Sequence, residues 1–170
     1  MKKLKEFLLE QRACQEGYDF AADLTLKEFL ETCQRGDWIL WLFAKINPTK
    51  LRELTLAKGY CANTVRHFMT DERSLRAVDV AIAFGEGKAT REELDDVSVS
   101  AFAAASATYA SASASAAAYA AYASASASAS CAATYAAAFA AASAYAKNAN
   151  RKLTADICRK YLPIEIWNNY

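Results

Sequence analysis

The sequence predicts an all-α protein, a compact multi-helix bundle with tightly packed Ala/Ser-rich helices. The chain has 170 residues but only five glycines and two prolines, a composition unlike that of collagen, disordered chains or loop-rich sandwiches. Its first hundred residues show apolar side chains at helical spacing between helix-capping motifs. Residues 101–146 contain 27 alanines and nine serines, and alanine has the highest helix propensity. We expect a single helical domain over residues 1–170.

Residues 1–88 are expected to form short amphipathic helices. An apolar stripe begins at Leu4 and Leu8, and Gly17 is expected to interrupt that first helix. Thr25 and Glu28 then have the spacing of a capping box, in which each side chain accepts a hydrogen bond from the other residue's backbone amide. A helix is therefore expected directly after Thr25, with Gly36 placed to end it.

The next helices follow from similar signals. Asp37 can cap a helix over the run 38–43, which is apolar nearly all round and should be central in the core. Proline is tolerated in a first helical turn, so Pro48 is expected to open another helix, which Gly59 could divide. Asp71 is expected to begin a helix that stops at residues 85–87.

Thr90 and Glu93 form a second capping box, which opens the Ala/Ser/Tyr-rich region 89–146. One helix over 91–146 would be roughly 84 Å long, about twice the ~40 Å diameter of a compact domain of this size. We therefore expect this region to fold back at least once, at the serine alternation 111–115 or at 124–130, the first being preferred. Residues 150–170 are expected to form a C-terminal helix and tail.

Three other structural hypotheses for the alanine-rich block are less well supported. A membrane span is disfavoured because residues 101–146 hold no Leu, Ile or Val. A silk-like strand stack would normally use glycine, and the serine parity changes between Ser115 and Ser124. An ice-binding helix would need regularly spaced threonines, whereas the block has only Thr108 and Thr134.

Charge and cysteine usage narrow the class of protein. The net charge is +1, and a general nucleic-acid binder needs a surplus of cations, so no nucleic-acid partner is expected. Charged residues at the start of the chain are unlike a signal peptide, which predicts a cytoplasmic protein of a bacterium or a phage-infected cell. Cys61 and His67 lack further ligands for zinc, and no metal or other cofactor is expected.

One cluster of residues is a candidate binding site for an anionic ligand or a protein partner. Three arginines and the single histidine fall within eleven residues at a helix end and the next helix start, where guanidinium groups and a helix N-terminus both attract anions. Two tryptophans could offer stacking faces. The candidate residues are Arg66, His67, Asp71, Arg73, Arg76, Trp38 and Trp41. In the alternative interpretation, Asp71 caps a helix, Arg73 and Arg76 pair with local acids and both tryptophans belong to the core.

No catalytic motif is found. Residues 85–90 resemble a phosphate loop but lack its first glycine at the required distance, and no nucleophile elbow or Glu-x-x-His pair occurs. The acidic residues at 92–96 fit a solvated first helical turn. We therefore expect a protein that is not an enzyme and has no catalytic residues.

The order of several short motifs resembles the immunity-protein family of the fifth type, with the immunity-like helical domains of bacterial and phage proteins. These motifs are Trp38-x-x-Trp41, Cys61-Ala62-x-x-Val65-x-His67-Phe68, Asp71-x-Arg73-x-x-Arg76-Ala77-Val78-x-x-Ala81-x-Ala83-Phe84-x-x-Gly87 and Ala155-Asp156-Ile157-Cys158-Arg159-Lys160-Tyr161-Leu162-Pro163. The resemblance spans roughly residues 37–163 and implies an all-helical protein that blocks a toxin or a defence component.

The expected function is that of a non-catalytic inhibitor that occludes a partner protein, as an immunity protein or a phage anti-defence protein does. The alternative is a protein that sequesters a small anionic ligand such as a signalling nucleotide. No membrane partner is expected, and the sequence leaves open whether the chain forms a homo-oligomer.

Overall fold

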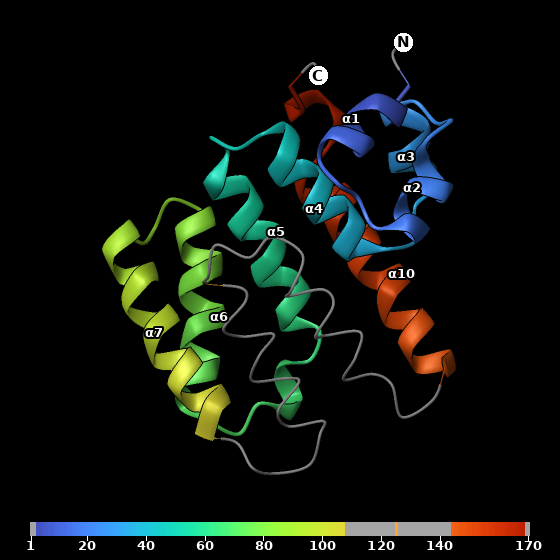
Figure 1. The fold of residues 1–170 in the computed structure, drawn as a ribbon. Helices are drawn as coiled ribbons and strands as arrows, with labels where there is room; N and C mark the ends of the chain where they lie inside the picture. The colour runs from blue at the N-terminus through green and yellow to red at the C-terminus, as the bar shows by residue number, and fades with distance from the viewer. Residues whose placement is uncertain (1–2, 108–124, 126–143, 169–170) are drawn as a thin grey trace.

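The computed structural model describes residues 3–107, 125 and 144–168, and it confirms the all-α class (Figure 1). No strand occurs among these residues, although Lys3 and Thr25 form an isolated antiparallel bridge. The described helices are α1 (Lys5–Glu10), α2 (Gln15–Ala21), α3 (Leu26–Thr32), α4 (Gly36–Ile46), α5 (Leu51–Asn63), η1 (Arg66–Phe68), α6 (Glu72–Gly85), α7 (Arg91–Ala107), α10 (Ala144–Tyr161) and η2 (Ile164–Ile166).

The helices form two groups on either side of α5 (Figure 1). On one side α5 packs against α6, and α6 packs against α7. On the other side α10 packs against α4 and α5, and the short helices α1, α2 and α3 lie beyond α4. The described chain begins and ends close to this second group.

Each group has its own hydrophobic cluster. The larger joins the helices α1 to α5 and α10, and it includes Phe43, whose ring is in edge-to-face contact with Trp167 at a centroid distance of 5.0 Å. The smaller lies between α6 and α7 and includes Phe84, Leu94 and Val97. Ala125 is buried against the smaller cluster. The described helices therefore form two packed halves, each with its own hydrophobic cluster, and α5 joins them.

Glycines permit the closest helix contacts. A Cβ on Gly36 would lie 2.7 Å from the backbone carbon of Thr154 in α10, and one on Gly85 would lie 2.7 Å from the Cα of Leu56 in α5. The prediction that Gly36 ends a helix is therefore wrong. Gly36 is instead the first residue of α4. It lies so close to α10 that only a residue without a side chain fits there.

Gly59 does not divide its helix, because it lies inside α5 where a Cβ would meet Ile82 of α6 at 2.8 Å. Gly17 does not interrupt the first helix, because it lies inside α2. The helical backbone is interrupted earlier, at Arg12, whose φ is positive. Pro48 does not open α5, which begins at Leu51 after a turn.

Three predicted helix starts are confirmed. Thr25 and Glu28 make both hydrogen bonds of a capping box at α3. Thr90 and Glu93 do the same before α7, where the Thr90 amide donates to Glu93 Oε2 at 2.7 Å and the Glu93 amide donates to Thr90 Oγ1 at 3.2 Å. Asp71 caps α6 by accepting from an amide two residues on.

Asp37 is not the N-cap that the sequence suggested. The N-cap of α4 is Arg35, and Asp37 lies in the first turn, where it accepts two hydrogen bonds from the Arg35 guanidinium at 2.9 and 2.6 Å. The expected fold-back points at 111–115 and 124–130 lie outside the described residues, apart from Ala125. Helix α10 begins at Ala144, before the start expected at residue 150.

Candidate functional site

The seven candidate residues lie in two separate places. Five lie in η1, at the N-cap of α6 and in the first half of α6, and the remaining two belong to α4. The two tryptophans line one cavity, and Arg73 and Arg76 line a different hollow. No candidate residue lines both. The structure therefore does not bring Trp38 or Trp41 to the arginine cluster as stacking faces.

Two of the three candidate arginines pair with neighbouring carboxylates. Arg66 in η1 donates to both carboxylate oxygens of Asp79 in α6, at 2.6 and 2.9 Å. Arg73 donates to both oxygens of Asp71, at 3.1 and 2.7 Å. These bonds raise the pKa of Arg66 and lower the pKa of Asp71. Arg66 thus joins η1 to α6, and Arg73 pairs with a local acid, as the alternative interpretation expects of it.

Arg76 differs from the other two arginines. It is exposed, and no ion pair of Arg76 occurs in the described part of the chain. Together with Arg73 it lines a hollow of about 480 Å³ between α6 and α7, which we call the α6–α7 hollow and which is completed by Asp96, Val97, Val99 and Ser100. A guanidinium in this position can donate hydrogen bonds to a carboxylate or phosphate from outside the molecule.

His67 lies exposed on η1, with its ring tilted over Phe68 at a centroid distance of 3.8 Å. Phe68 is itself 42% exposed. This contact places the imidazole at the surface, outside the α6–α7 hollow.

The two tryptophans flank a cavity of about 380 Å³, which we call the tryptophan cavity. Both are half-buried, so they are neither fully in the core nor freely exposed. The cavity is bounded by Leu8, Arg12, Ala13, Cys14, Gly17, Ala21, Phe29, Arg35, Asp37, Trp38, Trp41 and Leu42. It therefore collects side chains from α1, α2, α3 and α4, with the linker that contains Arg12.

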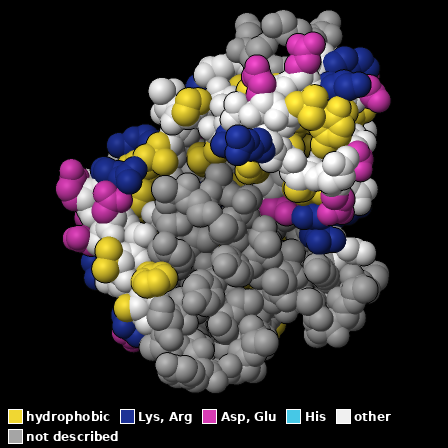
Figure 2. Space-filling model, viewed as in Figure 1, with side chains coloured by type: hydrophobic (Ala, Val, Ile, Leu, Met, Phe, Trp, Pro, Cys, Tyr) yellow, Lys and Arg dark blue, Asp and Glu magenta, His cyan; other side chains and the backbone are white. Residues whose placement is uncertain are grey.

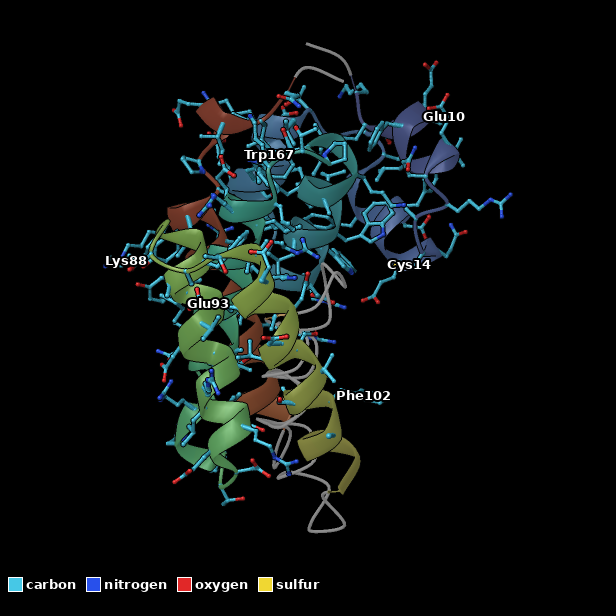
Figure 3. The ribbon with its side chains drawn as sticks, turned by 90° about the vertical axis from the view of Figure 1, so that its left-hand side faces the viewer. Glu10, Cys14, Lys88, Glu93, Phe102 and Trp167 are labelled. Carbon is cyan, nitrogen blue, oxygen red and sulfur yellow. The ribbon has the colours of Figure 1, made fainter. Side chains whose placement is uncertain are left out.

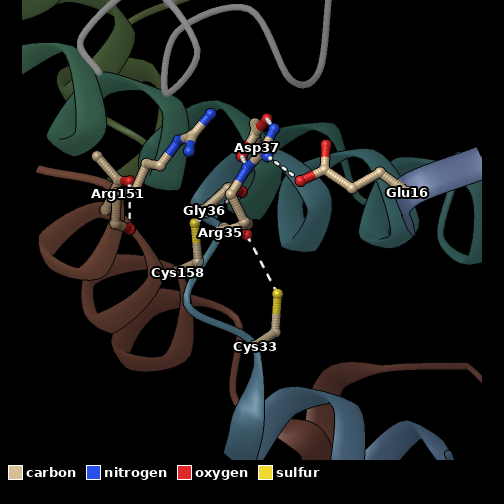
Figure 4. Close-up of polar contacts among 8 residues, drawn as sticks. Glu16, Cys33, Arg35, Gly36, Asp37, Arg151 and Cys158 are labelled. Carbon is tan, nitrogen blue, oxygen red and sulfur yellow. Dashed lines mark hydrogen bonds and ion pairs between the residues drawn. The ribbon is translucent and has the colours of Figure 1, made fainter. Parts of the chain in front are cut away.

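Arg35 is fixed at the edge of this cavity. Its guanidinium lies 4.4 Å from the centroid of the Trp38 ring, donates to Asp37, and contacts Glu16 of α2 at 3.5 Å (Figure 4). The hydrogen bond to Asp37 is the main reason that the pKa of Arg35 is raised. The guanidinium therefore lies between two carboxylates, and Trp38 covers its planar face.

Three buried thiols lie near this region, where α4, α5 and α10 meet. Cys61 and Cys158 have their sulfur atoms 3.9 Å apart, and the Cys158 thiol donates to the Gly36 carbonyl at 3.6 Å. The Cys33 thiol donates to the Arg35 carbonyl at 3.5 Å (Figure 4). Burial raises the pKa of Cys33 to about 11 and raises that of Cys158. Three of the four cysteines in the described residues are therefore buried and pack as small apolar side chains, whereas Cys14 is exposed.

Within residues 3–107, 125 and 144–168, no set of three His, Cys, Asp or Glu side chains is placed to hold a metal ion. No helix in the same ranges has the length and apolar character needed to cross a membrane.

Sequence reasoning missed two features of these sites. Val99 and Phe102 on α7 are 73% and 51% exposed, although both are apolar residues of a helix that faces a core. Their positions fall outside the stripe formed by Leu94, Val97 and Ala101, and that periodicity could have identified them as outward-facing. Arg12 was missed because no local pattern connects it with tryptophans more than twenty residues away.

Comparisons with protein-family models, with curated proteins and with solved structures find no match for this chain. The family resemblance of the motifs at 37–163 therefore stays a prediction, and the site is interpreted from its own residues.

Proposed function

We propose that this chain is a non-catalytic helical binding protein, which binds over the functional surface of a partner protein and thereby inhibits that protein. The observation that carries the proposal is the outward face of α7, where two apolar side chains are exposed: Val99, which lines the α6–α7 hollow, and Phe102, three residues further along the helix. We call Val99, Phe102, Arg73 and Arg76 together the α7 face.

The apolar part of this face is suited to a protein contact. Val99 and Phe102 are three residues apart, and such residues are neighbours on one side of a helix. Figure 3 shows Phe102 pointing away from the helices, and Figure 2 shows separate hydrophobic side chains over α7 among charged ones. An exposed aromatic side chain that becomes buried in a partner's pocket is a typical centre of binding energy.

The charged part gives the face a preferred partner. Arg76 presents a guanidinium without an ion pair in the described chain, and Arg73 lies on the same helix with its charge already balanced by Asp71. A partner that offers a carboxylate to Arg76 and an apolar pocket to Phe102 would match both features. We therefore propose an acidic protein surface as the target.

The class of partner and the compartment follow as parts of the same proposal. The family resemblance of the sequence supports a toxin or a defence component as the blocked protein. We propose the cytoplasm as the place of action, because Cys33, Cys61 and Cys158 are free buried thiols, as is usual in a reducing compartment.

The test is a growth-rescue assay in which this chain is co-expressed with the toxin gene nearest to its own gene. Wild-type protein is expected to restore growth. Phe102→Ser should remove about 2 kcal/mol of binding, roughly 30-fold in Kd, and should abolish rescue. The measured Kd of the purified pair would be compared between the variants.

The matched control is Leu9→Ser, which changes an apolar residue that is 59% exposed on α1, in the other half of the molecule. Both variants remove exposed apolar area, so neither should change the helical content. Rescue by Leu9→Ser but not by Phe102→Ser supports the α7 face. Full rescue by Phe102→Ser, or equal loss in both variants, contradicts it.

The second candidate function is sequestration of a small anionic ligand such as a signalling nucleotide. One observation favours it, namely that Arg73 and Arg76 line the same hollow of about 480 Å³. Calorimetric titration with a panel of nucleotides decides between the two candidates. If a nucleotide binds, Arg76→Ala should weaken its affinity, whereas Phe102→Ser should leave it unchanged. No binding across the panel would remove this candidate.

A further inference from the structure

We propose that the tryptophan cavity is a binding site for a small aromatic monocarboxylate. The inference is independent of the proposed protein partner, because the cavity belongs to α1–α4 while the α7 face belongs to α6 and α7. It rests on the size of the cavity, the chemistry of its walls and one cation at its edge.

The size sets the scale of the ligand. The cavity has about 380 Å³, which falls in the range of roughly 300–1,000 Å³ that small-molecule sites occupy. One water takes about 30 Å³ in the liquid, so the cavity has room for about a dozen non-hydrogen atoms. This is enough for one aromatic ring with a short acidic side chain.

The walls favour a flat apolar group. Trp38 and Trp41 contribute indole rings from successive turns of α4, and Phe29 adds a third aromatic ring from α3. Aliphatic contacts come from Leu8 and Leu42, which are almost fully buried. An aromatic ring in this space would make offset or edge-to-face contacts with its neighbours.

The charge at the edge favours a single negative charge on the ligand. Arg35 is already neutralised by Asp37 at 2.6 Å. Arg12 also lines the cavity, is exposed, and has no ion pair among the described residues. One guanidinium without an ion pair beside an apolar cavity suits a carboxylate, whereas the carboxylate of Glu16, the second acid beside Arg35, would repel a second negative charge.

The backbone at Arg12 adds a second observation. Its φ of 54° lies in the left-handed region, which glycine and asparagine adopt at lower cost than arginine. The conformation is held by hydrogen bonds from the amides of Arg12 and Ala13 to the carbonyls of Leu9 and Leu8, at 3.1 and 2.9 Å. The fold thus holds a long cationic side chain at a position where a smaller residue would be less strained, which points to a role for its charge.

The experiment uses 3-phenylpropionate as the probe, with 3-phenylpropanamide as its uncharged isostere. Binding to the full chain is followed by calorimetry and by tryptophan fluorescence, which the probe's ring does not disturb on excitation at long wavelength. The acid is expected to bind, to change the emission of Trp38 and Trp41, and to bind about tenfold or more tightly than the amide, because only the acid can form a charge-assisted bond.

Substitutions test whether Arg12 is the cation that binds the carboxylate of the probe. Arg12→Asn removes the guanidinium but keeps a side chain that tolerates the left-handed backbone, so the fold should persist. This variant should bind the acid about tenfold more weakly and the amide with unchanged affinity. The matched control is Lys152→Asn, which removes an exposed cation of α10 that lies outside both proposed sites, and this variant should bind both probes as the wild type does.

A chemical protection measurement makes the result independent of variant stability. Cys14 lines the cavity and is exposed at the start of α2, where Figure 3 shows it on the side of the molecule formed by the first helices. Bound acid should slow the alkylation of Cys14 by iodoacetamide, as followed by mass spectrometry. The proposal is overturned if the acid fails to bind, if the acid and the amide bind alike, or if Arg12→Asn and Lys152→Asn weaken the binding of the acid equally.

Discussion

The contact between Gly36 and α10 predicts a measurable loss of stability in Gly36→Ala. A Cβ at this position would lie 2.6 Å from Oγ1 and 2.7 Å from both Cβ and the backbone carbon of Thr154. Ordinary contacts to a Cβ begin at about 3.4 Å, so α4 and α10 would have to move apart by roughly 0.7 Å at this point. Because the obstacle includes backbone, rotation of the Thr154 side chain alone cannot relieve it.

The magnitude follows from the packing of the core. Forcing an extra methyl group into a well-packed interior costs about 1–3 kcal/mol. Alanine gains at most about 1 kcal/mol over glycine from helix propensity, and less at the first residue of α4. We expect a net loss of about 1–2 kcal/mol in the free energy of unfolding. For a chain of this length, each kcal/mol lowers Tm by roughly 2–4 °C.

The assay is urea and thermal unfolding followed by circular dichroism, with Gly17→Ala as the matched control. A Cβ on Gly17 would meet its nearest atom, Cys14 Sγ, at 3.3 Å and the Trp38 ring at 3.8 Å, so a small side-chain adjustment suffices. Since Gly17 lies inside α2, the control should be as stable as the wild type or more stable by up to about 1 kcal/mol. Equal stability of Gly36→Ala and the wild type would refute the close approach of α4 and α10.

Two further predictions concern titratable groups. At pH 8, iodoacetamide should alkylate Cys14 faster than Cys33 or Cys158, because burial raises the pKa of Cys33 to about 11 and also raises that of Cys158; equal rates in folded protein, measured on the separate peptides, would contradict this. The hydrogen bonds from Arg73 lower the pKa of Asp71, so the wild type should be more stable than Asp71→Asn above about pH 4, and this advantage should vanish as the pH falls through the lowered pKa. A difference in unfolding free energy that grows towards acid would show that the sign is wrong.

The sequence allowed prediction of the features that depend on neighbouring residues. The capping boxes at Thr25 and Thr90 and the cap at Asp71 are confirmed, because each is a contact over two or three positions of the chain. The central place of the run 38–43 is confirmed for Ile39, Leu40, Leu42 and Phe43, which are buried, whereas Trp38 and Trp41 are half-buried. Local chemistry and apolar periodicity were sufficient for these features.

Features that depend on distant partners could not be predicted. Glycine was interpreted as a helix end at Gly36 and as a divider at Gly59, whereas both positions are set by helices that approach from elsewhere in the chain. Lys58 lies fully buried in α5, which its charge alone would not suggest. The prediction that the tryptophans stack beside the arginine cluster is wrong for the same reason. The two sets of residues lie in different halves of the fold, which no local pattern could indicate.

The division into two halves explains why the two proposed sites can be tested separately. The tryptophan cavity is built on the larger hydrophobic cluster and the α7 face on the smaller one, and α5 is the element that joins them. Substitutions in sites without shared contacts usually have additive effects. Arg12→Asn and Phe102→Ser should therefore each weaken one ligand and leave the other unchanged. Coupling between them would mean that binding in the cavity moves α5 relative to α6, with the contacts of Gly59 at Ile82 and Gly85 at Leu56 as the places where such a shift would be felt.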